Sequence, residues 1–574
     1  MHCHIKILAK LYNHLAARID DMELFGKKIS GPFTIGSGIV TTNIGIIAKF
    51  AREIPQVGVL TTKSIGLAPK PGNIEPIFAD LPEKNTFINA VGLGNPGFEA
   101  FRAEAEKIYP LKNRFLLVSI FDSSPEGLVK IAKGLEGIAD GFELNFSCPH
   151  AEKGYGIHIG TSCELTGRYT KKLKDQVSKP IIVKMTPNVE NYSEIVEGAL
   201  NAGADGITAI NTIGPADNEV LSHGKGGVSG SFVKPRALEC VKITREVADR
   251  LGKKIPIIGM GGIMDADDVR QFRDAGATIF GVGSALTGLD TSSIKKYFAA
   301  MDKDLQGNQN SCASIVIKQK LMQYSPFKIT EIRQVDHDLK IFYFDRAIPH
   351  ARPGHYVFAW LKGVAEKPFS LAHNNPVMLV VRAVGPFTKK MFELKVGGTV
   401  MMRGPYGTAY PEMKDSVLVG GGTGVAPLFF LASQQLPSAV FIGGRTANQL
   451  LLKDEFSKIC MTFVSTDDGS EGFKGYVTDL LAGKLKSGLK IRSFSTAGPE
   501  IMMKKAADIA ANYLPEDKIL LSTERYYKCG VGICGVCECN GYRTCIDGPI
   551  MTAASVAPDF GRVHRDKTGK VLHF

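Results

Sequence analysis

Four cysteines near the end of the chain have the spacing of an iron–sulfur ligand set. In the segment CGVGICGVCECNGYRTC, the residues Cys529, Cys534, Cys537 and Cys545 are separated by four, two and seven residues. This is the plant-type [2Fe–2S] spacing with a short final gap. The glycines of the segment favour the same interpretation, because a loop that wraps closely around a cluster needs positive φ angles and backbone N–H groups directed at sulfur. We predict an electron-carrying cluster held by these four thiolates.

Zinc is the main alternative for this motif, and a disulfide framework is a second. A structural zinc site usually shows two paired CxxC knuckles, and structural disulfides require an oxidising compartment. Seven of the eleven cysteines lie scattered outside the motif, and the chain opens without a secretory signal pattern. Cys539 falls outside the cluster spacing and is interpreted as a bystander. We therefore expect a reducing, cytoplasmic location.

A second set of reactive residue types stands at the ends of short apolar runs in the first half of the chain. A cysteine in the loop after a strand can act as a base if its thiolate is accessible, and a nearby lysine favours the thiolate. By composition alone, a lone cysteine is more often structural. The residues of this set are Lys63, Asn145, Cys148, Lys184, Asn211 and Thr212.

The apolar runs that carry these residues predict a (β/α)8 barrel. Between Phe33 and about Ala300, short apolar runs alternate with amphipathic helical stretches, which is the pattern of parallel strands joined by crossover helices. In such barrels the active site lies at the carboxyl ends of the strands. The polar residues above are therefore expected to converge. The expected strands are centred on 33–38, 57–63, 115–120, 142–147, 181–185, 206–211, 256–261 and 278–283.

Glycine turns indicate where phosphate groups bind. Gly261-Gly262 and Gly283-Ser284 close the last two expected strands, which is a common phosphate site in these barrels. In the second half, GGGTGVAP (420–427) is a glycine turn that opens a helix and suits a pyrophosphate at the helix N-terminus. It lies in a strand–turn–helix series that predicts a doubly wound domain, preceded by a β-rich stretch typical of a small antiparallel barrel.

Composition excludes several classes of protein. A chain of 574 residues is too long for one hydrophobic core, so several domains are expected. The net charge of +12 is spread over isolated basic pairs, and no basic run is interleaved with aromatic residues, which argues against nucleic-acid binding. The uncharged stretch 416–433 contains GGGTG and a proline, which suits a phosphate-binding turn better than a membrane span.

In order along the chain, these motifs resemble the class 1B dihydroorotate dehydrogenases. TTKSI (61–65), NAVGLGNPG (89–97), NFSCPH (145–150), VKMTPN (183–188), AINTIGP (209–215), GGVSG (226–230) and GMGGI (259–263) are similar to the catalytic subunit of that family. PGHYVFAW, KPFSL, GPYG, GGGTGVAP, AGPE and the cysteine motif resemble its iron–sulfur flavoprotein subunit. The resemblance begins at Met22 and covers nearly the whole chain, which indicates a fusion of two subunits that are normally separate.

The resemblance implies an NAD-dependent oxidation of dihydroorotate to orotate in pyrimidine biosynthesis. Electrons would pass from FMN in the first barrel through the [2Fe–2S] cluster to FAD in the second, and then to NAD. Cys148 matches the family's catalytic base, with Lys63 beside the flavin. The residues that match the substrate site are Asn89, Val91, Gly92, Leu93, Asn145, Asn211 and Thr212.

The resemblance also assigns cofactor contacts. In the first half these are Ser37, Lys63, Asn145, Lys184, Gly230, Gly261, Gly262, Gly283 and Ser284. In the second half they are Lys367, Pro368, Phe369, Ser370, Gly421, Gly422, Thr423 and Gly424. Lys367 stands where related reductases more often have arginine, which puts a bidentate phosphate contact in doubt.

The same comparison of motifs divides the chain into six segments and implies a homodimer formed through the first barrel. The segments are an N-terminal extension (1–21), an FMN-binding barrel (22–303), a linker (304–315), an FAD-binding β-barrel (316–412), an NAD-binding α/β domain (413–522) and a cluster domain (523–574).

Two other functions stay open on the sequence. His150 stands where many dihydroorotate dehydrogenases have asparagine, and the SCPH form also occurs in dihydropyrimidine dehydrogenases, which act on uracil-type rings. Against this alternative, NAVGLGN offers backbone donors that suit a carboxylate, which uracil lacks. The second alternative is an electron-transfer reductase for a protein partner, with an idle first barrel. Arg445 leaves NADPH open, although we favour NADH.

Overall fold

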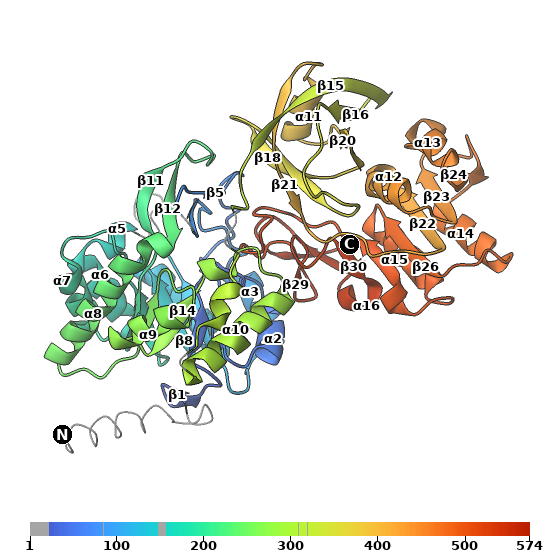
Figure 1. Cartoon of the computed structure of the whole chain (residues 1–574). Helices are drawn as coiled ribbons and strands as arrows, with labels where there is room; N and C mark the ends of the chain where they lie inside the picture. The colour runs from blue at the N-terminus through green and yellow to red at the C-terminus, as the bar shows by residue number, and fades with distance from the viewer. Residues whose placement is uncertain (1–21, 84, 147–156, 308, 318–319) are drawn as a thin grey trace.

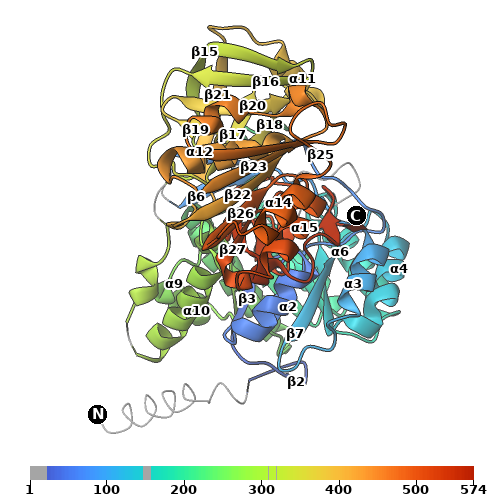
Figure 2. The same ribbon diagram turned by 90° about the vertical axis from the view of Figure 1, so that its right-hand side faces the viewer.

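The computed structural model describes residues 22–83, 85–146, 157–307, 309–317 and 320–574. Figures 1 and 2 show two lobes, a parallel barrel with its helices and a second lobe made of an antiparallel domain and a doubly wound domain. The segment that carries the four cysteines (529–545, here called the cluster loop) lies between the lobes. The multidomain α/β architecture predicted from the sequence is confirmed.

The parallel barrel closes in the strand order β10-β13-β14-β3-β4-β7-β8-β9. Its strands are buried on both faces, as parallel strands covered by helices are expected to be, and this explains uniform apolar runs such as FLLVSI in β7. All eight expected strands are present. They are β3 (Phe33–Ile35), β4 (Val59–Thr61), β7 (Phe115–Ile120), β8 (Gly141–Asn145), β9 (Ile181–Lys184), β10 (Gly206–Ala209), β13 (Ile257–Met260) and β14 (Ile279–Val282).

Helices cover the outside of this barrel. Several begin at a side-chain cap, for example Ser124 before α4 and Asp290 before α10, where the side-chain oxygen accepts a bond from a first-turn N–H group. The main helices are α2 (Ile44–Glu53), α3 (Phe98–Ala105), α4 (Pro125–Leu135), α6 (Cys163–Lys174), α7 (Tyr192–Asn201), α8 (Lys234–Arg250), α9 (Ala266–Asp274) and α10 (Thr291–Gln306).

A four-stranded sheet that the sequence did not predict lies beside the barrel, on the side of the second lobe (Figure 1). It joins two hairpins that are far apart in sequence in the order β11-β12-β6-β5. These strands are β5 (Phe78–Asp80), β6 (Thr86–Asn89), β11 (Ile213–Asp217) and β12 (Lys225–Gly230). Their pairing places Asn89 opposite Gly227, so this sheet carries one predicted substrate residue.

The antiparallel domain is a seven-stranded sheet wrapped around its own core. Phe342, Val357 and Leu379 from three of its strands belong to one buried cluster. The strand order is β18-β17-β21-β15-β16-β20-β19. The strands are β15 (Ser325–Asp336), β16 (Leu339–Phe344), β17 (Tyr356–Leu361), β18 (Ala365–Ser370), β19 (His373–Asn374), β20 (Val377–Arg382) and β21 (Thr399–Tyr406).

The doubly wound domain has six parallel strands and one antiparallel edge strand, in the order β25-β24-β23-β22-β26-β27-β30. Its strands are β22 (Ser416–Gly421), β23 (Ala439–Gly444), β24 (Met461–Thr466), β25 (Phe473–Lys474), β26 (Ser493–Ala497), β27 (Ile519–Ser522) and β30 (Ile550–Thr552). The helices that cover it include α12 (Val425–Gln434), α14 (Val477–Lys486) and α15 (Glu500–Ala510). No helix among the described residues is long and apolar enough to cross a membrane.

Candidate functional site

One cavity at the carboxyl end of the barrel strands gathers the residues predicted for the first half. The strand ends supply lysines, asparagines and glycines, while β6 and β12 supply one wall. Every predicted site residue of this half that the structure describes lines it. They are Ser37, Lys63, Asn89, Val91, Gly92, Leu93, Asn145, Lys184, Asn211, Thr212, Gly230, Gly261, Gly262, Gly283 and Ser284.

Hydrogen bonds fix the orientation of the amides in this cavity. Asn145 Nδ2 donates to Ser64 Oγ at 2.8 Å, and Ser64 Oγ lies 3.1 Å from Ser37 Oγ. Asn89 Nδ2 donates to the Gly227 carbonyl at 3.2 Å. Asn211 Oδ1 accepts from the Thr212 N–H at 2.9 Å. Side chains held in this way are pre-organised to recognise a planar ring that offers both donors and acceptors.

Two lysines give the cavity a positive wall. Lys184 is buried, and its Nζ lies 3.8 Å from Oε1 of the fully buried Glu143. Thr208 Oγ1 donates to the other oxygen of Glu143 at 3.1 Å. Burial lowers the pKa of Lys63 to about 8, and repulsion from Lys528 acts in the same direction. These cations suit an anionic ligand or a flavin that gains negative charge on reduction.

The loop that includes Val91, Gly92 and Leu93 has the backbone of an anion cradle. Gly92 and Leu93 both have positive φ, at 74° and 54°. Turns with such residues produce concave sets of N–H groups that bind anions. Asn73 braces this loop, because its backbone N–H donates to the Val91 carbonyl at 3.1 Å and its Nδ2 to the Ala90 carbonyl at 2.9 Å.

Two predicted features of this half lie outside the described residues. Cys148, the predicted base, and His150, the departure from the family pattern, both belong to the segment 147–156. Their roles stay predictions. The described part of β8 ends at Asn145, which lines the cavity.

The four motif cysteines are buried and converge in pairs. The Cys529 sulfur accepts from the Cys534 N–H at 3.5 Å, and the Cys529 side chain interacts with those of Cys534 and Cys545, as the Cys545 side chain does with that of Cys537. Four buried thiols that lie together at the plant-type spacing can hold two irons with two thiolates each. All nine cysteines that the structure describes are free thiols. The thiols therefore fit a [2Fe–2S] cluster.

The cluster loop adopts the backbone that its glycines predicted. Gly530, Gly532 and Gly535 have φ of 77°, 75° and 65°. Cys539 is also buried, and its sulfur accepts from Arg525 Nη2 at 3.2 Å. Burial raises the pKa of the Cys539 thiol to about 12, which is consistent with a neutral bystander.

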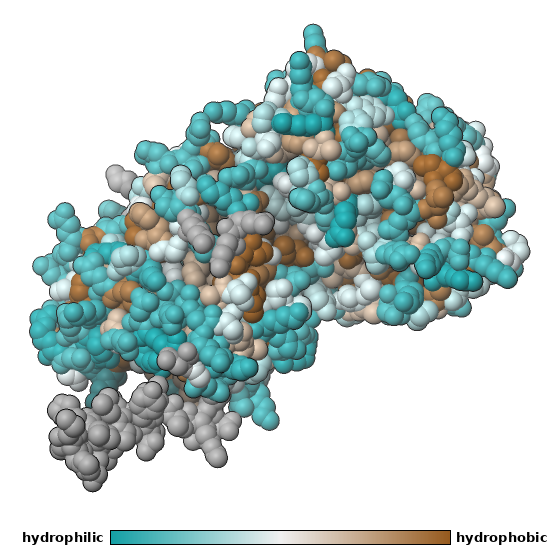
Figure 3. Space-filling model, viewed as in Figure 1, coloured by the Kyte–Doolittle hydropathy of each residue, from teal (hydrophilic) through white to brown (hydrophobic). Residues whose placement is uncertain are grey.

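The cluster loop closes one side of the barrel cavity. Ile533, the residue before Cys534, lines the cavity directly. Its carbonyl accepts from the Val40 N–H at 2.6 Å, and the Val531 carbonyl accepts from the Gly288 N–H at 2.9 Å. Figure 3 shows hydrophobic residues gathered in the hollow where the lobes meet. The structure therefore places a predicted cluster ligand next to the predicted flavin site.

The predicted cofactor residues of the second half lie apart from this cavity. Lys367, Pro368, Phe369 and Ser370 form the end of β18. The run from Gly421 to Gly424 leads from the end of β22 into α12, and Gly422 has a positive φ of 55°. A glycine turn at this position, at the carboxyl end of a parallel strand, suits a pyrophosphate group.

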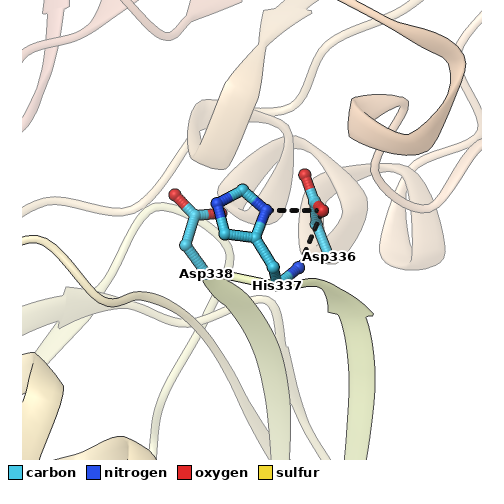
Figure 4. Close-up of side chains that lie close together, drawn as sticks. All are labelled: Asp336, His337 and Asp338. Atoms are coloured by element: carbon cyan, nitrogen blue, oxygen red, sulfur yellow. Dashed lines mark hydrogen bonds and ion pairs between the residues drawn. The ribbon is translucent and has the colours of Figure 1, made fainter.

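A second group of possible metal ligands lies at the turn between β15 and β16. Ligand atoms of Asp336, His337 and Asp338 lie within 4.8 Å of one another (Figure 4). Asp338 already forms two bonds with Arg382 at 2.7 and 2.8 Å, and Asp336 accepts from both the backbone N–H and Nδ1 of His337. These contacts indicate that the three side chains stabilise the hairpin turn.

Ile533, Phe78 and Glu75 are among the residues of this region that the sequence did not predict. Ile533 and Phe78 line the cavity, and Glu75 joins the two lobes beside it. An isoleucine next to a cysteine ligand carries no signal of such a role. A lone glutamate before a proline carries none either, because its partners are distant in sequence.

Comparison with known proteins matches each half separately. Residues 21–305 match the family model described as dihydroorotate dehydrogenase, and residues 524–557 match the iron–sulfur cluster binding domain of dihydroorotate dehydrogenase B. The catalytic subunit of dihydroorotate dehydrogenase B (NAD(+)) from Pyrococcus abyssi is 41% identical over 46% of this chain and 87% of that protein. This chain belongs to the dihydroorotate dehydrogenase B family. The family predicted from the sequence is confirmed.

The second half matches the partner subunit of the same enzyme. A probable electron transfer subunit of dihydroorotate dehydrogenase B from Methanocaldococcus jannaschii is 40% identical over 43% of this chain and 97% of that protein. This chain therefore combines in one polypeptide the counterparts of two subunits of these relatives. A solved structure of an NADH-dependent reduced ferredoxin-NADP oxidoreductase covers 41% of this chain and 90% of that protein, with 28% identity and a TM-score of 0.38.

Proposed function

We propose that the chain oxidises dihydroorotate to orotate and passes the electrons to NAD+. The observation that carries the proposal is the shared cavity. Anion-binding backbone, oriented asparagines and two lysines line one space, and Ile533 of the cluster loop forms part of its wall. A ring with a carboxylate fits this set of groups, and the adjacent cluster loop provides an exit for electrons.

The residues of the cavity have separate tasks in this proposal. The loop from Val91 to Leu93 binds the substrate carboxylate, and the amides of Asn89, Asn145 and Asn211 orient the ring. Cys148 removes a proton from ring carbon 5 while hydride leaves carbon 6. The overall reaction balances as dihydroorotate and NAD+ giving orotate, NADH and a proton.

The residues present fit the four cofactors of the family. FMN fits the cavity between Lys63, Lys184 and the glycines that follow β13 and β14, and the cluster fits the four buried thiols. FAD fits the end of β18, and NAD the doubly wound domain. When bound, these groups supply hydride acceptance and one-electron transfer. We propose NAD over NADP, since the matched relatives are named for NAD(+).

An anaerobic assay of the purified holoenzyme tests the proposal. We expect dihydroorotate to bleach the flavin absorbance and to support NAD+ reduction, with dihydrouracil and NADP+ much less effective. Preference for dihydrouracil would favour the dihydropyrimidine alternative suggested by His150. Flavin reduction by NADH alone, with neither ring substrate active, would favour a reductase for a protein partner.

We also propose a cytoplasmic homodimer that forms through the parallel barrel. The support is the resemblance of this half to the catalytic subunit of the family. Light scattering after size-exclusion chromatography is expected to give twice the chain mass. A monomer would contradict the proposed dimer without affecting the proposed reaction.

A further inference from the structure

Glu75 of the parallel barrel makes an unusual set of contacts with the second lobe. It lies in the loop between β4 and β5, and its side chain is 4% exposed. Its carboxylate lies 3.0 Å from Lys367 Nζ, 3.9 Å from Lys528 Nζ and 3.3 Å from the Tyr526 hydroxyl. Its backbone carbonyl accepts from the Glu366 N–H at 3.2 Å.

The partners of Glu75 belong to the two electron-transfer elements of the second lobe. Lys367 lies in β18, at the predicted FAD turn, and Lys528 directly precedes the cluster ligand Cys529. Lys528 is also buried, and its Nζ donates to the Pro71 carbonyl at 2.7 Å, in the same loop as Glu75. One carboxylate therefore contacts both the flavin turn and the start of the cluster loop.

The loop that carries Glu75 is also tied to the substrate cavity. Asn73 braces the segment from Ala90 to Val91, as described above, and the backbones of Lys70 and Asn95 bond to each other in both directions at 2.9 Å. A rigid path of short contacts thus runs from the predicted carboxylate cradle to Glu75, and from there to Lys367.

The amine of Lys367 is already committed to this contact. In related reductases an arginine at this position would reach a flavin phosphate with two donors. Lysine has one ammonium group, and here it pairs with Glu75 and lies 5.3 Å from the centre of the Tyr526 ring. The attraction of Glu75 raises the pKa of Lys367 although burial opposes this, so the ammonium form is favoured.

We propose that Glu75 is a positioning residue that sets the flavin turn and the cluster loop in register with the substrate cavity, and that Lys367 serves this contact instead of binding a flavin phosphate. The proposal rests on the proposed function for its electron path. Without the carboxylate, the buried ammonium group of Lys528 and the half-buried one of Lys367 would lose their shared counter-charge, and the lobes would move apart to hydrate them.

The test compares Glu75→Gln, Lys367→Gln and the double variant in the holoenzyme. The matched control is Glu219→Gln, because Glu219 and Lys362 also bridge the two lobes at 3.4 Å but are 85% and 72% exposed. We expect Glu75→Gln to lower coupled NAD+ reduction about ten- to hundredfold, the scale of effect that small displacements of reacting groups produce. Glu219→Gln should change this rate less than twofold.

Half-reactions separate positioning from chemistry. In Glu75→Gln, dihydroorotate should still reduce the barrel flavin, and NADH should still reduce the second flavin, at wild-type rates. The double variant should be no slower than the slower single variant, because both substitutions remove one shared contact. Wild-type coupled turnover in Glu75→Gln, or additive losses in the double variant, would overturn the positioning role.

Two further measurements need no ring substrate. After ultrafiltration, Lys367→Gln should retain as much FAD as Glu75→Gln does, and both should show faster hydrogen exchange in residues 70–77 than the control. Loss of FAD from Lys367→Gln alone would show that this lysine binds the flavin phosphate, which overturns the proposal. If dihydroorotate reduced no form of the enzyme, the proposed function would fail while FAD retention and exchange would still decide the Glu75 contact.

Discussion

The cluster loop has two faces that are held in different ways. On the face toward the parallel barrel, contacts are spread over several groups, with backbone bonds from Val40 to Ile533 and from Gly288 to Val531, and with Arg543 Nη2 donating to the Leu289 carbonyl at 3.0 Å. On the face toward the antiparallel domain, the contacts come from side chains, chiefly Arg403, and the Tyr356 hydroxyl donates to the Cys545 carbonyl at 3.1 Å. Arg403 Nη1 donates to the Cys529 carbonyl at 2.9 Å, and the same side chain pairs with Glu366 at 2.8 Å.

Two glycines of the loop mark the same division. A Cβ on Gly535 would lie 1.8 Å from Thr42 Oγ1 of the parallel barrel, and one on Gly530 would lie 2.6 Å from a ring carbon of Phe358 in the antiparallel domain. Both domains therefore approach the loop as closely as glycine allows. Contacts spread over several groups tolerate the loss of one side chain better than a single buried ion pair does.

The largest effect is expected from loss of the cluster, which would carry electrons between the two lobes. Cys534→Ser replaces a thiolate with a poor ligand for iron, so cluster assembly should fail and NAD+ reduction by dihydroorotate should fall close to zero. Each half-reaction should persist, with dihydroorotate bleaching FMN and NADH bleaching FAD. Rapid-mixing absorbance on protein of known iron content measures all three rates.

Cys148→Ser should slow only the half-reaction in the parallel barrel. A serine hydroxyl is a far weaker base than a thiolate, so flavin reduction by dihydroorotate near neutral pH should slow by about 10²–10⁴-fold. The rate should recover in part at high pH, and NADH should still reduce the second flavin normally. Stopped-flow traces with a wild-type rate at pH 7 would remove Cys148 from the role of base.

Single substitutions at the two faces should differ in their cost to stability. Arg403→Met leaves Glu366 buried without its charged partner, and the free energy of unfolding of the second lobe should fall by about 3–5 kcal/mol. On the other face, Asn43 Nδ2 donates to the Gly535 carbonyl at 2.5 Å. Asn43→Ala should cost about 0.5–1.5 kcal/mol.

Guanidinium unfolding followed by flavin fluorescence measures both variants. Equal losses at the two positions would contradict the contrast between a concentrated and a distributed interface.

An effect smaller than that of Arg403→Met is expected inside the barrel cavity. Asn211→Ala removes one ring-facing amide and should weaken orotate binding by about 1–3 kcal/mol, while flavin content stays unchanged. Titration of the FMN spectrum with orotate measures this. An unaltered dissociation constant would mean that Asn211 does not contact the ring.

Local patterns predicted much of this molecule. The eight barrel strands follow from apolar runs whose burial on both faces leaves little ambiguity, and the cluster loop follows from cysteine spacing within one short segment. The sheet that joins β6 to β12 was not predictable, since neither hairpin reveals its partner. Glu75 and Lys367 are 292 residues apart, and only the packing of the two lobes brings them together.

In the proposed function, electrons cross from the barrel cavity to the second lobe through the cluster. Anaerobic titration of the intact holoenzyme with dihydroorotate, without NAD+, tests it most directly. We predict uptake of about five electrons per chain, because each flavin accepts two electrons and the cluster one. Uptake that stops at about two electrons, with the cluster and the second flavin still oxidised, would contradict the account.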